Sequence, residues 1–141
     1  EGVVPPLETF GANSAPLTVR GQFLLRRFEK IRAIEVYPAL SVLRIGQSLK
    51  VPKAHLATYK HQVGGEESRL VILDYLLRND VVFIYQQDYH RLIQNSDVFE
   101  AFFSALTGLL SHRGLCEKPP LGFPIKQGWI HFPVMNVDFS L

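Results

Sequence analysis

The chain has 141 residues, of which 47% are hydrophobic and 20% charged, and its formal net charge is +2. This length and composition fit one folded domain and exclude an intrinsically disordered chain. The mildly basic balance permits an anionic partner without requiring one. The single cysteine excludes an internal disulfide framework and is typical of a reducing compartment, so we expect a cytoplasmic protein. No apolar run is long enough to span a membrane, and the N-terminal residues do not have the pattern of a signal peptide.

The N-terminal part of the chain is expected to be an irregular segment followed by a basic helix. Residues 1–16 are rich in Pro, Gly, Asn and Ser, which favour turns. Apolar residues then recur at helical spacing to about Lys30. The other face of this helix carries Arg20, Arg27 and Lys30, and Lys50 follows later in the chain. These four cations are the candidate contacts to nucleic-acid phosphates, and a solvated basic surface is the alternative.

An acidic residue lies inside the β-branched run Ile34-Glu35-Val36, which ends at Tyr37-Pro38. Ile, Val and Tyr favour a strand, and Pro38 cannot continue a ladder of hydrogen bonds because it has no N–H. A carboxylate on an otherwise apolar strand is costly unless something cationic meets it. A metal ion is one such partner for Glu35, and Arg32 or an arginine of the first helix is another.

The middle of the chain is expected to consist of short helices and loops. Residues 39–45 predict a short helix that Gly46 ends as the C′ residue, and 47–65 predict a long loop. The next expected helix has Glu66 and Glu67 suited to its N-terminus and ends at Asn79 or Asp80. The apolar run 81–85 is either a buried strand or the start of a helix.

The strongest predicted helix follows a short helical piece over 87–94. It begins with Ser96 as the N-cap and ends near His112. A stripe of small residues along it would let the helix backbone approach a sheet or another helix closely. Residues 128–133 then predict a final strand. The small residues of the stripe are Ala101, Ala105 and Gly108.

Carboxylates are the remaining candidates for chemistry, because the chain has no phosphate-binding loop, no zinc-ligand spacing and no nucleophile elbow. Glu35 lies on the predicted strand, and Asp97 and Glu100 lie at the start of the long helix. Acids gathered at one end of a sheet can hold Mg²⁺ or Mn²⁺, which activate a water in phosphodiester cleavage.

Three blocks of the sequence resemble a predicted nuclease family with an RNase H-like fold, the domain-of-unknown-function family 429. The first is Ile34-Glu35-Val36-Tyr37-Pro38, which looks like the acidic strand of that family. The second, residues 99–107, is similar to its helix that continues to Ala-Leu-Thr, and the third, Gln127-Gly128-Trp129-Ile130 followed by Pro133, is similar to its closing strand.

The resemblance implies an α/β domain over residues 17–133, the C-terminal part of an RNase H-like fold with a small mixed sheet covered by helices. Residues 134–141 would then be a C-terminal tail. The implied function is metal-dependent hydrolysis of nucleic acid, completed by residues outside this chain. Glu35 and Glu100 would be catalytic acids that bind Mg²⁺ or Mn²⁺ with Asp97, and Gln127 replaces a family carboxylate.

The resemblance also implies that the first strands of the fold are missing, including the one that carries the first metal-binding acid. That strand would normally pair with the acidic strand, so the edge at Glu35 should be open. A partner chain or a preceding segment would complete the sheet. The alternative function is therefore a non-catalytic interaction domain that joins a partner through this open edge.

Overall fold

The computed structural model of the protein describes residues 21, 23–28, 32–124 and 128–139. The chain divides into two compact units, residues 1–34 and 35–141. In the first unit, residues 21 and 23–27 are helical, which confirms that part of the expected N-terminal helix. Four apolar side chains of this unit are each about half exposed: Phe23, Leu24, Leu25 and Phe28.

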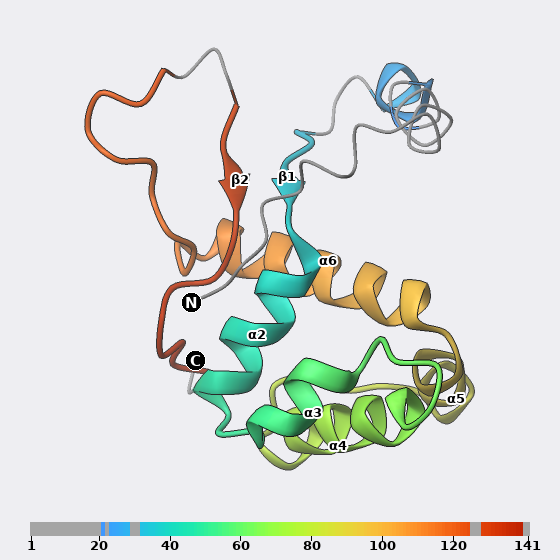
Figure 1. Ribbon diagram of the computed structural model, residues 1–141. Helices are drawn as coiled ribbons and strands as arrows, with labels where there is room; N and C mark the ends of the chain where they lie inside the picture. Colours follow the sequence, from blue (N-terminus) through green and yellow to red (C-terminus); the bar gives the residue numbers. More distant parts are fainter. Residues whose placement is uncertain (1–20, 22, 29–31, 125–127, 140–141) are drawn as a thin grey trace. The chain divides into compact units, whose positions relative to one another are not determined.

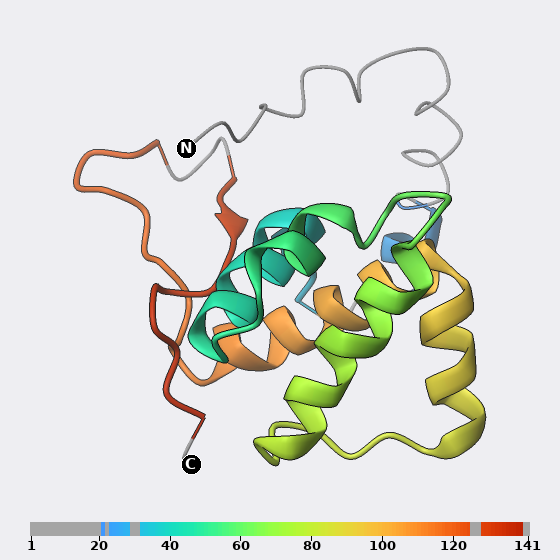
Figure 2. The ribbon, with the colours of Figure 1, turned by 60° about the horizontal axis from the view of Figure 1, so that its bottom comes forward.

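The second unit is a mixed α/β structure that consists mostly of helices (Figures 1 and 2). Its two short strands pair in parallel, with Glu35 opposite Ile130 and Val36 opposite His131. Every helix that the structure describes in this unit lies between the two strands in sequence, as a parallel pair requires a long crossover connection. The elements are β1 (Glu35–Val36), α2 (Pro38–Ser48), α3 (Lys53–Thr58), α4 (Gly65–Arg78), α5 (Gln86–Gln94), α6 (Ser96–His112) and β2 (Ile130–His131).

Helix α6 is the centre of this unit, because it contacts α2, α5 and both strands. The rings of Phe99 and Phe103 on its inner face are fully buried, with centroids 4.8 Å apart. Burying a side chain of this size contributes about 1.5–3 kcal/mol. Helices α3 and α4 pack on each other, and α4 also contacts α5. The fully buried aliphatic residues around the two rings are Val42, Ile45, Ile72, Leu73 and Leu76.

The end of the second predicted helix and the loop predicted after it differ from the expectation. Helix α2 continues to Ser48, so Gly46 does not end it and is instead a buried helical residue. A Cβ on Gly46 would lie 2.3 Å from Leu56 Cδ2, which shows how closely α2 and α3 approach. The predicted loop 47–65 contains α3, whose six residues are too few to show a helical period in the sequence.

The other helical predictions are confirmed at most of their boundaries. Helix α4 ends with Asn79 as its C-cap, and α6 ends at His112. The N-cap of α6 is Asn95 rather than Ser96, since its side chain accepts hydrogen bonds from the N–H groups of Asp97 and Val98 at 2.8 and 3.1 Å. The run 81–85 is neither strand nor helix, and Tyr85 is the residue that precedes α5.

The residues after β2 contribute to the core. Val137 is buried, and its N–H donates to Ser48 Oγ at 2.9 Å. The segment predicted as a tail therefore packs against the end of α2. The small-residue stripe along α6 is open by contrast: Ala101 and Ala105 are exposed, and a Cβ on Gly108 would meet no described atom within 4 Å.

Two glycine-to-alanine substitutions in helices should have opposite effects on stability. Gly108→Ala is expected to raise the free energy of unfolding by about 0.5–1 kcal/mol, because alanine loses less backbone entropy in a helix. Gly46→Ala receives the same entropic benefit but forces Leu56 to move, so it should be less stable than Gly108→Ala by about 1–3 kcal/mol. Urea denaturation of both variants measures the difference, and equal stabilisation would contradict the close contact of α2 with α3.

Candidate functional site

The Glu100 carboxylate, near the start of α6, is engaged by two side chains that follow α3. Tyr59 Oη donates to Glu100 Oε1 at 2.7 Å, and Lys60 Nζ lies 2.8 Å from the same oxygen. Tyr59 is buried, whereas the Lys60 side chain is half exposed and that of Glu100 is 16% exposed. The carboxylate therefore already has a hydrogen-bond donor and a cationic partner.

Tyr59 is held in place by its own neighbours. Its ring lies 5.5 Å from that of Phe99, and its carbonyl oxygen accepts a hydrogen bond from Arg69 Nη1. The buried Arg69 also donates from Nε to the Ile93 carbonyl at 2.6 Å, so one guanidinium joins the end of α3 to the end of α5. Burial, followed by the hydrogen bond to Glu100 and its negative charge, raises the pKa of Tyr59 far above its usual value. The phenol therefore stays protonated and remains a donor.

The Glu35 side chain lies in a different environment. It is exposed on β1, and among the described residues it forms neither a hydrogen bond nor an ion pair. It lines a pocket of about 420 Å³ together with residues of β2 and of the segment that precedes it. The other residues that line this pocket are Phe123, Gly128, Trp129, Ile130 and Phe132.

The predicted acids therefore do not share neighbours. Glu100 contacts residues that follow α3, whereas Glu35 lies beside β2, and Asp97 is exposed on the first turn of α6. Within the described ranges, no group of three His, Cys, Asp or Glu side chains could hold a metal ion. These residues alone do not fit a Mg²⁺ or Mn²⁺ centre, and such a centre would need ligands from elsewhere.

The predicted nucleic-acid contacts are only partly within the described structure. Arg20 and Lys30 lie outside the described residues. The Arg27 guanidinium lies 4.8 Å from the centroid of the Phe23 ring in the first unit, and Lys50 is exposed after α2 in the second. The two described cations therefore belong to different units, and a common basic surface stays a prediction.

Two histidines have structural partners. His55 Nδ1 lies 3.3 Å from Ser68 Oγ, and Thr58 Oγ1 lies 2.7 Å from the same hydroxyl. Ser68 is buried and also donates to the Gly64 carbonyl at 3.1 Å, so this group holds α3 against α4. In the same way, His131 Nδ1 lies 2.9 Å from Ser111 Oγ, which links β2 to α6. Both histidines are satisfied by serine hydroxyls, as expected for residues without ligand spacing.

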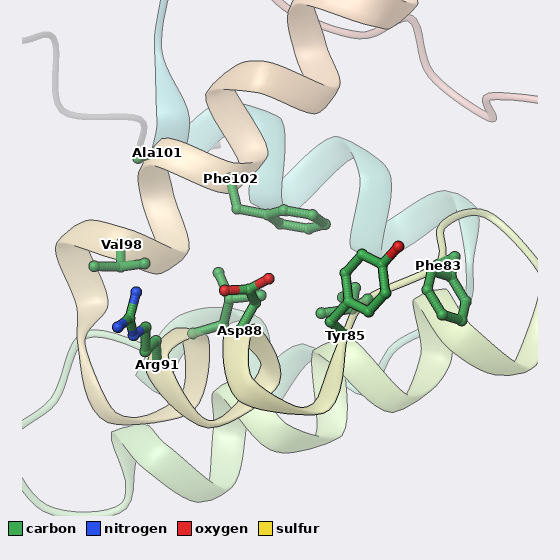
Figure 3. Close-up of a pocket in the computed structure, with 9 residues that line it drawn as sticks. Phe83, Tyr85, Asp88, Arg91, Val98, Ala101 and Phe102 are labelled. Carbon is green, nitrogen blue, oxygen red and sulfur yellow. The ribbon is translucent and has the colours of Figure 1, made fainter.

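A second pocket, which the sequence did not indicate, lies between α5 and α6. Figure 3 shows Asp88 and Arg91 projecting from α5 toward residues of α6. The pocket has a volume of about 420 Å³ and a mostly apolar wall. One end of the pocket is formed by the exposed Phe83 and Tyr85, which belong to the apolar run 81–85. Their rings contact edge to face, with centroids 5.1 Å apart. One acid and one base at its rim give it no net preference for either charge.

Tyr59 and Tyr89, which both donate hydrogen bonds to carboxylates, should make the stability of the fold sensitive to high pH. Burial, followed by its hydrogen bond to Asp74, raises the pKa of Tyr89 from 10.0 to about 12, and Tyr59 is shifted in the same direction. Because the folded-state pKa values are raised, this stability is fully present below about pH 10 and is lost as the pH rises above it.

We expect the free energy of unfolding of the unmodified chain to fall between about pH 10 and pH 12, and to fall less steeply in Tyr59→Phe and Tyr89→Phe. Urea denaturation at a series of pH values, with tyrosinate absorbance recorded in parallel, measures this. Tyr85→Phe, at an exposed ring, is the matched control for loss of one hydroxyl. If the free energy of unfolding falls as steeply with pH in both test variants as in the unmodified chain, the carboxylate partners do not raise the pKa values of these phenols.

Comparison of the chain with protein-family models, with curated protein sequences and with solved structures finds no match. Within the described residues, no helix combines the length and the apolar character that crossing a bilayer requires.

Proposed function

We propose that this chain is a partner-binding domain that receives an extended segment of another polypeptide at the open edge of β1. The observation that carries the proposal is that β1 pairs with β2 on one side only, and no other described strand lies beside it. Successive residues of a strand direct their N–H and C=O groups to opposite sides. One of Glu35 and Val36 therefore directs these groups away from β2, where an added strand could bond them.

The size of the sheet supports the same proposal. Two parallel strands of two residues each form the sheet. Sheets this small are marginal by themselves, and parallel sheets normally have more strands and are covered on both faces. A further strand beside β1 would extend the ladder and reduce its exposure to water.

The exposed small residues of α6 are a second feature that a partner could use. Ala101 and Ala105 are exposed, and the space beside Gly108 is open. Small side chains let another backbone approach a helix closely, so this face suits a packed strand or helix better than it suits water. Glycine within a helix costs about 0.5–1 kcal/mol, which close packing against a partner would offset.

The proposal includes the RNase H-like fold as its architectural basis. In that family the acidic strand would normally pair with the first strand, which the sequence blocks of this chain do not include. Here the acidic strand β1 pairs with β2, which contains Ile130 of the closing block, and its other edge is unpaired in the described structure. This arrangement supports a C-terminal part of the fold to which a strand from elsewhere is added.

Hydrogen exchange at single amides tests the open edge. We expect one amide of Glu35 and Val36 to be protected by β2 and the other to exchange nearly as fast as in an unfolded chain. Raising the protein concentration should slow the second amide, because a free edge also pairs with copies of itself. Nuclear magnetic resonance of the ¹⁵N-labelled chain, with sedimentation at the same concentrations, measures both effects.

Two variants at one exposed position provide the control. Ala33→Pro places next to β1 a proline, which discourages edge pairing, and should weaken the concentration dependence, whereas Ala33→Ser adds no such obstacle and should not. Protection of both strand amides at the lowest concentration would mean that the edge is already covered. That result, or exchange independent of concentration in every variant, would contradict the proposal.

A metal-dependent nuclease-like function, completed by residues outside this chain, is the second candidate. It is favoured by the Glu35 carboxylate, which is exposed and has no bonded partner among the described residues. Calorimetric titration with Mn²⁺ should then give a saturable heat that disappears in Glu35→Gln. The same heat should persist in Glu66→Gln, an exposed acid at the start of α4. The absence of saturable heat from the unmodified chain would count against this candidate.

A further inference from the structure

The pocket beside Glu35 has an aromatic wall with one carboxylate at its edge. Trp129 is at the centre of this wall, with the Phe123 ring edge to face at 5.1 Å and the Phe132 ring tilted at 5.9 Å. All three rings are only partly buried, so part of each remains accessible to a ligand. The faces of aromatic rings carry partial negative charge and attract cations.

The wall is held by backbone contacts rather than by loose packing. Trp129 Nε1 donates to the Glu117 carbonyl at 3.0 Å, and the Glu117 N–H donates to the Phe132 carbonyl at 3.0 Å. Gly128, the residue before Trp129, has a φ of +74°, a backbone conformation that residues other than glycine rarely adopt. The indole is thus fixed in orientation before any ligand arrives, which lowers the entropic cost of binding.

The charge of the pocket selects its ligand. Among the described residues that line it, Glu35 is the one titratable group, and its carboxylate has no hydrogen-bond or ion-pair partner in that part of the chain. An unpaired anion next to aromatic faces favours an organic cation over an anion or a purely apolar group. A guanidinium suits it better than an ammonium, because its planar group can stack on a ring and donate two parallel hydrogen bonds to one carboxylate.

We propose that this pocket binds an arginine side chain of a partner polypeptide. The guanidinium pairs with Glu35 and stacks against the rings around Trp129, while the aliphatic stem covers Ile130 and Phe132. A volume of about 420 Å³ accommodates such a side chain. The proposal does not require strand addition at β1, since the pocket could bind an arginine from a segment in any conformation.

The chain contains a single tryptophan, Trp129, so its fluorescence reports on this pocket alone. The probe is a capped pentapeptide with arginine at its centre and alanine at the other positions, and the control peptide has citrulline in place of arginine. Citrulline keeps the shape of the side chain but has no charge. We expect the arginine peptide to change the Trp129 fluorescence in a saturable way, and the citrulline peptide to bind at least about tenfold more weakly.

Two protein variants locate the interaction. Glu35→Gln should weaken binding of the arginine peptide about tenfold and reduce its dependence on salt, whereas Glu66→Gln should leave binding unchanged. Phe123→Leu keeps the reporter but removes one ring and should also weaken binding. Circular dichroism verifies that the variants are folded. Equal binding of the two peptides, an unaffected Glu35→Gln variant, or an unchanged fluorescence would each overturn the proposal.

These outcomes are independent of those for the open edge. Pocket binding is read from Trp129, and strand addition is read from the amides of Glu35 and Val36. A fluorescence response without added amide protection would support the pocket and contradict strand addition by this peptide. Mn²⁺ that displaces the arginine peptide from the unmodified chain, but not from a Glu35→Gln chain, would instead assign the carboxylate to a metal and overturn the arginine proposal.

Discussion

Burial of the aromatic face of α6 is the interaction on which the second unit depends. Phe99 and Phe103 lie one turn apart and are fully buried against aliphatic residues of α2 and α4. Because successive residues of a helix are about 100° apart, this orientation also determines where the polar residues of α6 point. Glu100, directly after Phe99, is thereby placed at the margin of the core, where Tyr59 meets it. The same orientation leaves Ala101 and Ala105 exposed.

A polar network around the core joins α3, α4 and α5 and fixes positions that non-directional hydrophobic contact alone would not specify. The buried Arg69 of α4 donates to carbonyl groups at Tyr59 and Ile93, and Tyr59 in turn donates to Glu100. A buried guanidinium without partners would be strongly unfavourable, so these contacts specify one arrangement of α3, α4 and α5. In this network Glu100 accepts the hydrogen bond that holds the Tyr59 phenol, which gives the carboxylate a structural role in the fold.

The strand pair, by contrast, leaves groups that the described structure does not satisfy. Beyond α6, the outer edge of β1 is free in the described structure, and an acidic side chain lies next to aromatic rings. An edge, an unpaired carboxylate and a fixed indole are each suited to an external polypeptide. Their proximity in one small region supports reading this end of the molecule as the surface that meets a partner.

Local patterns in the sequence determined most of the helices and both strands. The apolar period and terminal residues of α4 and α6 were sufficient, because capping and amphipathicity act over a few neighbouring positions. The β-branched run around Glu35 and the closing run at Ile130 were likewise recognisable.

Tertiary structure decided what periodicity does not encode: that α3 forms within an apparent loop, that Gly46 is a packing position, and that Phe83 and Tyr85 remain exposed. It also decided the partners of the acids. Glu100 meets Tyr59 and Lys60 across 41 and 40 residues of chain, respectively, and Glu35 meets the Trp129 pocket only when the two strands pair. Contacts between distant residues depend on how helices pack in three dimensions, and no local pattern records that packing.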